Sequence, residues 1–492
     1  MALQLKRLFA YIENLRIGWL GIFLIANAVI FSRVLAEGVF DNQTIFSYWT
    51  IIFWQSWFLS LFICLVIFVS IVAKIKPITA AKFVLTGLPV ILLPLTGLFF
   101  GFSGHFDFPQ GTWPELFFLI ATLAFFYPKL GPVFSLEIIL TLSAVFLFFL
   151  IRASWPRALL GAIGTYSVIA FFGLQGKIIS DFLRVDFFST NLNLSQIFAL
   201  ANFALLLSSI TVLFLLINRK KARALIFNLR PERSFSLITF AVFIIIGALN
   251  SPNFYLINFL AGFALFVLLL FYAAISNDVS DINIDKVSNP NRPYARGIFV
   301  KKEMLILQIL ILAMIAILVL IIDSMPILIL TAINVGLSVL YSVFRFRKFL
   351  FSHLIAAAGE STAILYGYFV QAPNSSSAPM ELWILFFAVF IFFALFLPVK
   401  DLKDFAGDKK EKVRNFLTVF GWQKGKIITA IFVFFAFIFL AFIMGSPLFF
   451  ALSFIFAGLG AYFVIYYEKV GERVSYINFL LFITIFLLTN FI

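Results

Sequence analysis

The chain has 492 residues, of which 63% are hydrophobic and only 12% are charged. A soluble globular protein has about half apolar and about a quarter charged residues, so this composition excludes a water-soluble enzyme and a disordered chain. Apolar runs of about 17 residues or more recur along the whole chain, and each is long enough to cross a bilayer. Because these runs lack the alternation of membrane strands, the sequence predicts an all-α polytopic membrane protein.

The first half of the chain contains apolar runs at about 17–34, 50–73, 83–101, 133–151, 158–176 and 195–217. Both ends of this half are basic, which requires an even number of crossings, so we expect about six transmembrane helices. The extra apolar piece Leu116–Tyr127 is then re-entrant, interfacial or the first part of a broken helix. Residues 1–217 are therefore predicted as an N-terminal membrane domain, followed by a basic cytoplasmic linker at 218–233.

The second half, residues 234–492, contains nine apolar runs, at about 235–249, 254–276, 304–322, 327–344, 350–370, 382–399, 427–444, 448–466 and 476–492. Lysine and arginine occur only in alternate connections between these runs. Positive charge marks the cytoplasmic side, so nine helices with a cytoplasmic start satisfy every connection. The formal net charge of +14 is thus a topology signal, and we expect no nucleic-acid partner. We expect the cytoplasmic membrane of a prokaryote as the location.

Two acidic runs follow the second and the sixth of these nine apolar runs. Both have the pattern Asp-x-x-Asp-x-x-x-Asp, and they comprise Asp278, Asp281 and Asp285, and Asp401, Asp404 and Asp408. In a helix, residues three, four and seven apart share a face, so each run presents three carboxylates together. The topology places both triplets at the same membrane face, where six carboxylates repel one another unless cations lie between them. Mg²⁺ is suited to such oxygen ligands when it shares them with phosphates.

The alternative interpretation is that both runs are solvated helix ends. One triplet alone fits that interpretation, but two identical triplets at the inner ends of apolar helices favour a shared site. The two triplets include much of the aspartate and glutamate of the second half of the chain, which otherwise has few acidic residues.

The surrounding residues resemble the UbiA superfamily of intramembrane prenyltransferases over roughly residues 230–492. The first triplet with Asn277, Asn291-Arg292-Pro293 and Gly297 resembles the family's first aspartate-rich motif, and Lys400 to Asp408 with Gly407 resembles the second. Tyr341 to Arg345 resembles the family's Tyr-x-x-x-Lys element. The resemblance implies a nine-helix UbiA-like bundle in the C-terminal half.

The resemblance also implies an activity, which is Mg²⁺-dependent transfer of an isoprenoid chain from an allylic polyprenyl diphosphate to a hydrophobic or aromatic acceptor in the bilayer. This acceptor is an aromatic quinone precursor or a lipid. Asp281, Asp404 and Tyr341 are then catalytic candidates, and Asn277 with the six aspartates forms the metal-ligand set. The candidates for diphosphate binding are Lys286, Arg292, Arg345 and Arg414. The pocket is expected toward the cytoplasmic face.

Four departures from the family pattern concern the loops around the motifs. Arg345 replaces the usual Lys, Arg296 stands where Ser is frequent, and Lys412 and Asn415 occupy places where Gly and Thr are common. None removes a carboxylate.

Glu360 lies about ten residues from either membrane face, in the middle of an apolar run. An acid at that depth is costly and is a candidate for function, so Glu360 is a fourth catalytic candidate, for acceptor deprotonation or for steering the carbocation. The structural alternative is a buried acid bonded to Ser361, Thr362 or another helix.

Other functions remain open at this stage. A cation-coupled transporter has a similar number of helices but places its acids near the midplane, and a catalytically inactive membrane protein is the further alternative. A CDP-alcohol phosphotransferase requires an Asp-Gly dipeptide, which occurs nowhere in the chain. The identity of the acceptor and the donor chain length are not encoded in a recognisable way.

The first half is either a degenerate repeat of the second half or an accessory membrane domain. Its second apolar run is followed by Lys74 and Lys76, where the second half has its first acidic triplet. We therefore expect residues 1–217 to be non-catalytic.

Overall fold

The computed structural model describes residues 2–40, 48–93, 112–122, 131–183, 190–227, 231–342, 351–445, 447–466 and 471–491. Within these ranges the regular elements are helices and there are no strands, so the predicted all-α fold is confirmed. The chain divides into two compact units, residues 1–222 and 223–492. The division falls inside the basic stretch 218–233 that the sequence marks as a linker.

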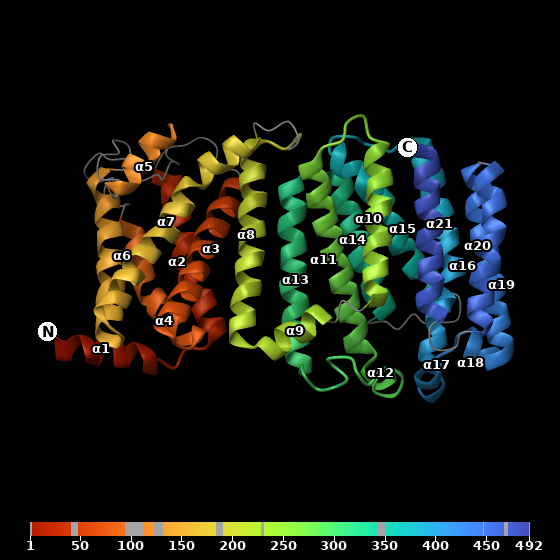
Figure 1. Cartoon of the computed structure of the whole chain (residues 1–492), viewed down its shortest axis with the longest axis horizontal. Helices are drawn as coiled ribbons and strands as arrows, with labels where there is room; N and C mark the ends of the chain where they lie inside the picture. The colour runs from red at the N-terminus through yellow and green to blue at the C-terminus, as the bar shows by residue number, and fades with distance from the viewer. Residues whose placement is uncertain are drawn as a thin grey trace. The chain divides into compact units, whose positions relative to one another are not determined.

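The first unit is a bundle of long apolar helices with shorter helices at its ends (Figure 1). Its helices are α1 (Ala2–Asn14), α2 (Trp19–Phe40), α3 (Tyr48–Ala73), α4 (Pro77–Gly87), α5 (Trp113–Ala121), α6 (Gly131–Arg152), α7 (Trp155–Leu183) and α8 (Leu194–Ile217). The short basic helix α9 (Arg219–Phe227) follows and contains the division between the units. Figure 1 shows α1 lying across the ends of α4 and α6.

Five of the six expected N-terminal spans are long apolar helices, and the third differs. The sequence predicts it at 83–101, whereas α4 begins earlier, at Pro77, and ends at Gly87, followed by a 3₁₀ segment to residue 93. Residues 94–101 of the predicted span lie outside the described residues. Pro89 explains this end, because proline lacks an amide donor and disfavours α-helical backbone in the residue before it. The first part of the apolar piece Leu116–Tyr127 lies in α5, which at nine residues is too short to cross a bilayer. Residues 123–127 of this piece lie outside the described residues.

The second unit contains nine long helices in its described residues. These are α10 (Pro231–Leu249), α11 (Leu256–Ser280), α13 (Lys301–Ile322), α14 (Met325–Ser342), α15 (Phe351–Gln371), α16 (Met380–Phe396), α19 (Trp422–Met444), α20 (Pro447–Tyr466) and α21 (Gly471–Phe491). Three short helices, α12 (Ile282–Ser288), α17 (Asp401–Lys410) and α18 (Phe416–Phe420), lie together at one end of this bundle (Figure 1). The nine-helix prediction for this half is confirmed.

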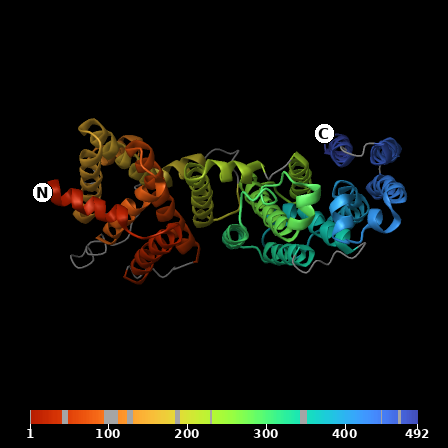
Figure 2. The same ribbon diagram turned by 90° about the horizontal axis from the view of Figure 1, so that it is seen from below.

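Helix α15 carries polar side chains and lies inside the bundle. Across the described residues of both units, eleven helices are long and apolar enough to span a membrane, and α10, α15 and α21 are not among them. It packs against α10, α11, α14 and α16, and its residues from Ser361 to Gln371 are all buried. Figure 2 views the helices of this unit nearly end-on. A helix shielded from lipid by its neighbours can carry polar side chains, as His353 and Glu360 do.

Two glycines allow α10 and α15 to cross at close backbone contact. A Cβ built on Gly247 meets the backbone oxygen of Ile364 at 1.9 Å, and one built on Gly367 meets that of Ile244 at 2.1 Å. Small residues at helix crossings let backbones approach in this way within membranes. The contact holds α15, and therefore its polar face, at a defined depth in the bundle.

We predict that Gly247→Ala destabilises the protein, because the added methyl group must push two helix backbones apart. Overpacking of this kind costs about 1–3 kcal/mol, and a clear fall in the thermal midpoint of the detergent-solubilised protein is expected. Gly336→Ala in α14 is the matched control, since a Cβ there meets nothing within 4 Å. Equal midpoints for the two variants would contradict the close contact.

Candidate active site

The first wall of the site is formed where α11 ends and α12 begins. Asp278 lies in the last turn of α11, Asp281 is the residue between the two helices, and Asp285 lies in α12. The backbone amides of Asp281 and Asp285 donate to the carbonyls of Asn277 and Asp281 at 2.9 and 2.8 Å. The chain thus stays nearly helical through the junction, which keeps the first acidic triplet close together.

The second wall is formed by α17, which contains the whole second triplet. A 3₁₀ turn, Leu397–Lys400, links α16 to α17, and Pro398 lies in its first turn. Asp401 and Asp404 lie in the first turn of α17, where the exposed backbone amides of a helix favour negative charge. Asp408 follows one turn later and is buried.

Direct hydrogen bonds join the two walls, although their triplets are more than 110 residues apart in sequence. The side-chain amide of Asn289 donates to Oδ1 of Asp404 at 2.7 Å. The Ser288 hydroxyl accepts from the backbone amide of Gly407 at 2.8 Å and donates to the backbone oxygen of Asp404 at 3.2 Å. Gly407 is required at this position, because a Cβ would lie 2.6 Å from the Ser288 hydroxyl. The two acidic helices are therefore held together at one end of the bundle.

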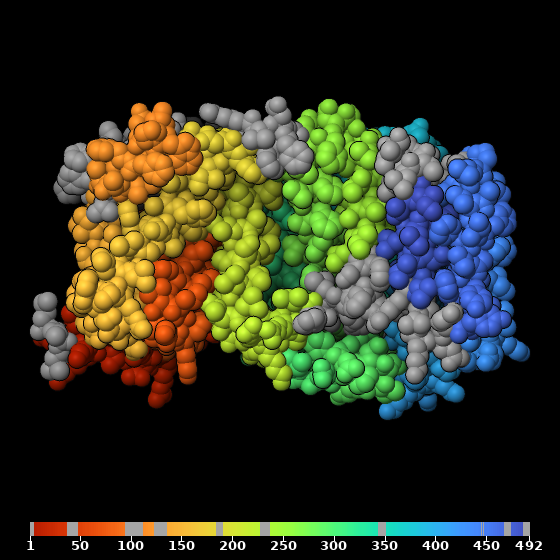
Figure 3. All heavy atoms as spheres, viewed as in Figure 1, coloured from red at the N-terminus to blue at the C-terminus, as the bar shows by residue number. Residues whose placement is uncertain are grey.

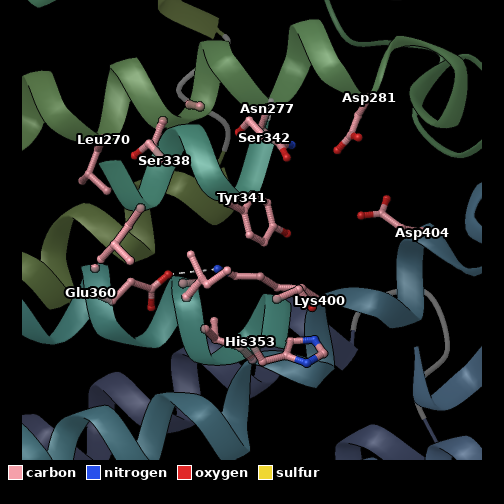
Figure 4. Close-up of a pocket in the computed structure, with 18 of the residues that line it drawn as sticks. Leu270, Asn277, Asp281, Ser338, Tyr341, Ser342, His353, Glu360, Lys400 and Asp404 are labelled. Atoms are coloured by element: carbon pink, nitrogen blue, oxygen red, sulfur yellow. Dashed lines mark hydrogen bonds and ion pairs between the residues drawn. The ribbon is translucent and has the colours of Figure 1, made fainter. Parts of the chain in front are cut away.

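A pocket of about 320 Å³ lies between these walls. Figure 4 shows Asp281 and Asp404 pointing toward one another across it, with Tyr341 projecting into the space beside them. Carboxylate and amide groups line one end, and Phe240, Phe266, Leu269 and Leu270 line the rest together with other apolar side chains. The pocket thus joins an acidic end to an apolar chamber.

Arg292 is the principal counter-charge of the first triplet. Its Nη1 bonds to the carboxylate of Asp285 and lies 3.6 Å from Oδ1 of Asp278, and all three side chains are buried. Burial raises the pKa of Asp285 to about 6, although the positive charge of Arg292 opposes the rise. Asp285 and Asp278 in turn raise the pKa of Arg292, overcoming the effect of burial. At neutral pH the carboxylate of Asp285 is therefore ionised, and it becomes protonated as the pH falls through about 6.

The deeper part of the pocket holds a second charged pair. Nζ of Lys400 lies 3.0 Å from Oε1 of Glu360, which is the pair joined by the dashed line in Figure 4. Beside it, Nε2 of His353 lies 3.3 Å from Oδ2 of Asp401. An ion pair in this position places both a proton acceptor and a cation next to the apolar chamber.

The donor set suits Mg²⁺ that is shared with a phosphate ligand. Within the described residues, no three Asp, Glu, His or Cys side chains converge closely enough to hold a metal ion by themselves. Mg²⁺ in phosphoryl sites binds one or two carboxylates and completes its shell with phosphate oxygens and water. Asp281 and Asp404, on facing walls with Asn277 nearby, offer such a partial ligand set. The residues present therefore fit this metal.

Most of the residues selected from the sequence line this pocket. These are Asn277, Asp281, Arg292, Tyr341, Glu360, Asp401, Asp404, Asp408 and Arg414. Asp278 and Asp285 do not line it and instead bind Arg292. Lys286 lies exposed on α12 and away from the pocket. Arg345 falls outside the described residues.

Several residues in or beside the pocket were not selected from the sequence. Asn289 and Asn415 bond to Asp404 and Asp408, and Lys400 binds Glu360. His353 also lines the pocket, next to Asp401. A lysine and a histidine at the inner ends of apolar helices are the signals that were available, because such groups need a partner or an aqueous cavity there.

Comparison with known proteins identifies the family. The UbiA prenyltransferase family matches residues 236–486, which is about half of the chain and lies within the second unit. The chain belongs to the UbiA prenyltransferase family. The resemblance of its two aspartate motifs is thus confirmed, and the family match does not extend into residues 1–222.

Three solved structures of this family are similar to the second half of the chain. The first is a digeranylgeranylglyceryl phosphate synthase with 24% identity, which covers 54% of this chain and 96% of its own, at a TM-score of 0.37. The second is a UbiA homologue from Archaeoglobus fulgidus bound to GPP and Mg²⁺, with 16% identity, coverage of 52% and 99%, and a TM-score of 0.40. The third is an apo UbiA homologue from Aeropyrum pernix K1, with 18% identity, coverage of 52% and 97%, and a TM-score of 0.40. No curated protein matches the chain.

We predict that Arg292→Met lowers stability, and more strongly at pH 8 than at pH 5. Removing one partner of a buried ion pair costs about 3–5 kcal/mol. The loss matters most when Asp285 is ionised, and below a pKa of about 6 a protonated Asp285 needs no counter-charge. Thermal unfolding of the detergent-solubilised protein without divalent ions measures the effect. Arg296→Met is the control, since Arg296 is exposed in the same loop; a pH-independent loss in Arg292→Met would contradict the ion-pair account.

Proposed function

We propose that this UbiA family protein transfers an isoprenoid chain from an allylic polyprenyl diphosphate to a hydrophobic or aromatic acceptor within the membrane, with Mg²⁺ as cofactor. The observation that supports this most is the pair of acidic walls facing one another at the mouth of an apolar chamber. One end of such a pocket suits a metal-bound diphosphate and the other suits a hydrocarbon chain.

The acidic end is suited to departure of the diphosphate. When bound, Mg²⁺ neutralises the negative charge that develops on the leaving group as the carbon–oxygen bond breaks. Asp281 and Asp404 hold their positions because Asn289 and the Ser288–Gly407 contact join the two walls. Arg414 is exposed at the pocket wall, where a guanidinium can bind phosphate oxygens in a bidentate manner.

The apolar chamber is suited to the isoprenoid chain and to the allylic cation that forms from it. Phe240 and Phe266 line it, and aromatic faces stabilise positive charge where water is excluded. Tyr341 projects into the space between the acidic end and the chamber (Figure 4). In this proposal it lies beside the carbon at which the bond to the acceptor forms.

Glu360 is suited to the acceptor side of the reaction. The acceptor loses a proton as the new bond forms, and a carboxylate in the chamber can hold that proton. Lys400 orients Glu360 through their 3.0 Å contact. Within the described residues, neither side chain has a hydrogen bond or ion pair to Asp281 or Asp404, so we assign them to the acceptor.

The remaining expectations follow from the same arrangement. The acidic end of the bundle carries the basic connections, so we propose that the pocket opens toward the cytoplasm.

A cation-coupled transporter is less well supported, because most of the carboxylates lie at one end of the bundle and the family is one of transferases. We propose no catalytic role for residues 1–222, which hold no counterpart of the two acidic triplets in their sequence.

We predict that Asp281→Asn and Asp404→Asn each lower transfer by at least about a hundredfold, because each removes one Mg²⁺ ligand and several kcal/mol of charge stabilisation. Purified protein in lipid is incubated with radiolabelled prenyl diphosphates of several lengths and a panel of acceptors, with Mg²⁺ or with chelator. Asp323→Asn is the control, since Asp323 caps α13 in a left-handed conformation that asparagine also adopts. A catalytically inactive protein would give no magnesium-dependent product with any donor.

We predict a different pattern for Glu360→Gln. Its loss of kcat is expected to reach about 10²–10⁴-fold, the usual contribution of a positioned acid or base, while the KM for the donor stays unchanged. Hydrolysis of the donor in the absence of acceptor should also continue. Loss of donor binding in this variant would contradict the assignment of Glu360 to the acceptor.

A further inference from the structure

The first unit contains a cavity of its own, which is larger than the pocket of the second unit. Its volume is about 630 Å³, within the range of about 300–1,000 Å³ typical of small-molecule sites. Its walls come from α3, α6 and α7, with α1 and residues of α4 at one end. In Figure 3 the side chains of α6 and α7 form much of the face of this unit that is turned toward the viewer.

The lining of this cavity is mainly apolar. Phe9 and Ile12 of α1, Trp57 and Phe62 of α3, and Val145 of α6 are buried side chains in its walls. Helix α1 is fixed over the end of the cavity, because Lys82 donates to the backbone oxygen of Glu13 at 2.8 Å and Arg152 forms an ion pair with Glu13. The space therefore suits a long apolar chain.

One polar group in the wall has no partner within the protein. Thr165 of α7 is fully buried, lines the cavity, and its hydroxyl makes no hydrogen bond. Buried hydroxyls are nearly always paired, and in helices threonine commonly bonds to the carbonyl one turn earlier. A hydroxyl left unpaired at a cavity wall indicates a ligand that carries a hydrogen-bonding group at this point.

The charges of the lining exclude a diphosphate. Arg33 and Glu137 are the charged residues in the cavity wall, and they have opposite signs. The catalytic pocket differs, since it combines several acids with Arg292, Lys400, Lys403 and Arg414. A cavity without net positive charge or clustered carboxylates suits a ligand with an uncharged head.

We infer that the first unit binds a neutral lipid, namely a long apolar chain that ends in a hydroxyl or carbonyl group, with this group hydrogen-bonded to Thr165. The inference does not depend on the proposed transferase activity. It gives residues 1–222 a ligand-binding role that is separate from the acidic pocket of the second unit.

The test uses the full-length protein in lipid nanodiscs and a photoreactive diazirine derivative of farnesol, a long-chain alcohol. Saturable labelling of peptides from α3, α6 or α7 is expected, with displacement by unlabelled farnesol. Gly173→Leu should reduce the labelling at least about tenfold, because Gly173 lines the cavity and its Cβ position is open, so leucine occupies the space. Gly336→Leu in α14 is the matched control, since its Cβ position is equally open.

Thr165→Val separates hydrogen bonding from packing. A buried hydrogen bond lost to an isosteric methyl group should weaken binding of the alcohol by roughly tenfold. Binding of the corresponding diazirine hydrocarbon, which lacks the hydroxyl, should stay the same. A structural role of Thr165 would change both probes equally, which would overturn the assignment of the head group.

Two further outcomes decide against the inference. Labelling that is not saturable, or that is displaced equally well by a phospholipid, would show that the cavity holds ordinary bilayer lipid. Labelling of the first unit that persists unchanged in Gly173→Leu would place the probe elsewhere. Asp281→Asn should retain the labelling, so failure of the transferase proposal and failure of this one give different results.

Discussion

The structure of the catalytic unit depends on bringing like charges together at one end of an apolar bundle. Two aspartate triplets meet there, and the protein compensates part of their charge with its own groups. Arg292 binds Asp285 and Asp278, His353 lies beside Asp401, and Asn415 donates to Asp408 at 2.8 Å. Asn289 likewise donates to Asp404 at 2.7 Å. Asp281 and Asp404 face each other across the pocket. Because carboxylates in one site repel unless a cation lies between them, this pair carries the case for a metal.

The bundle around the site explains why such a charged end can exist in a membrane protein. Helix α15 is enclosed by α10, α11, α14 and α16, and its backbone touches α10 at Gly247 and Gly367. This enclosure allows Glu360 and His353 to lie in a helix that does not have to be apolar toward lipid. The charged pair Glu360–Lys400 then lies deeper than the aspartates, beside the apolar chamber. One pocket therefore holds two separate polar sites, which the proposed function assigns to the donor and to the acceptor.

Much of the fold followed from the sequence, because bilayer-length apolar runs and alternate basic connections constrain a membrane bundle strongly. The nine helices of the second unit and the position of both acidic triplets were predicted in this way. The third N-terminal helix begins six residues earlier than predicted, and its α-helical part gives way to a 3₁₀ segment around Pro89, although the sequence stays apolar there. An apolar composition indicates that a segment lies in lipid, but it does not indicate where a proline interrupts the helix.

The site was predicted less completely, for a physical reason. Helical spacing places Asp278, Asp281 and Asp285 on one face, yet only tertiary contacts decide which carboxylate binds Arg292 and which faces the pocket. The partners Asn289 and Lys400 are likewise set by packing between helices that are distant in sequence. The unpaired Thr165 in the first unit has no sequence signature at all, because threonine in an apolar helix is usually bonded to its own backbone.

The central claim is that the two acidic walls hold one metal-bound diphosphate between them. Electron–nuclear double resonance on the purified protein with Mn²⁺ and a non-hydrolysable prenyl diphosphate analogue tests it directly. The account predicts phosphorus-31 coupling to the bound Mn²⁺, lost when either Asp281 or Asp404 is changed to Asn. Mn²⁺ bound tightly without phosphorus coupling, or coupling that survives both substitutions, would contradict it.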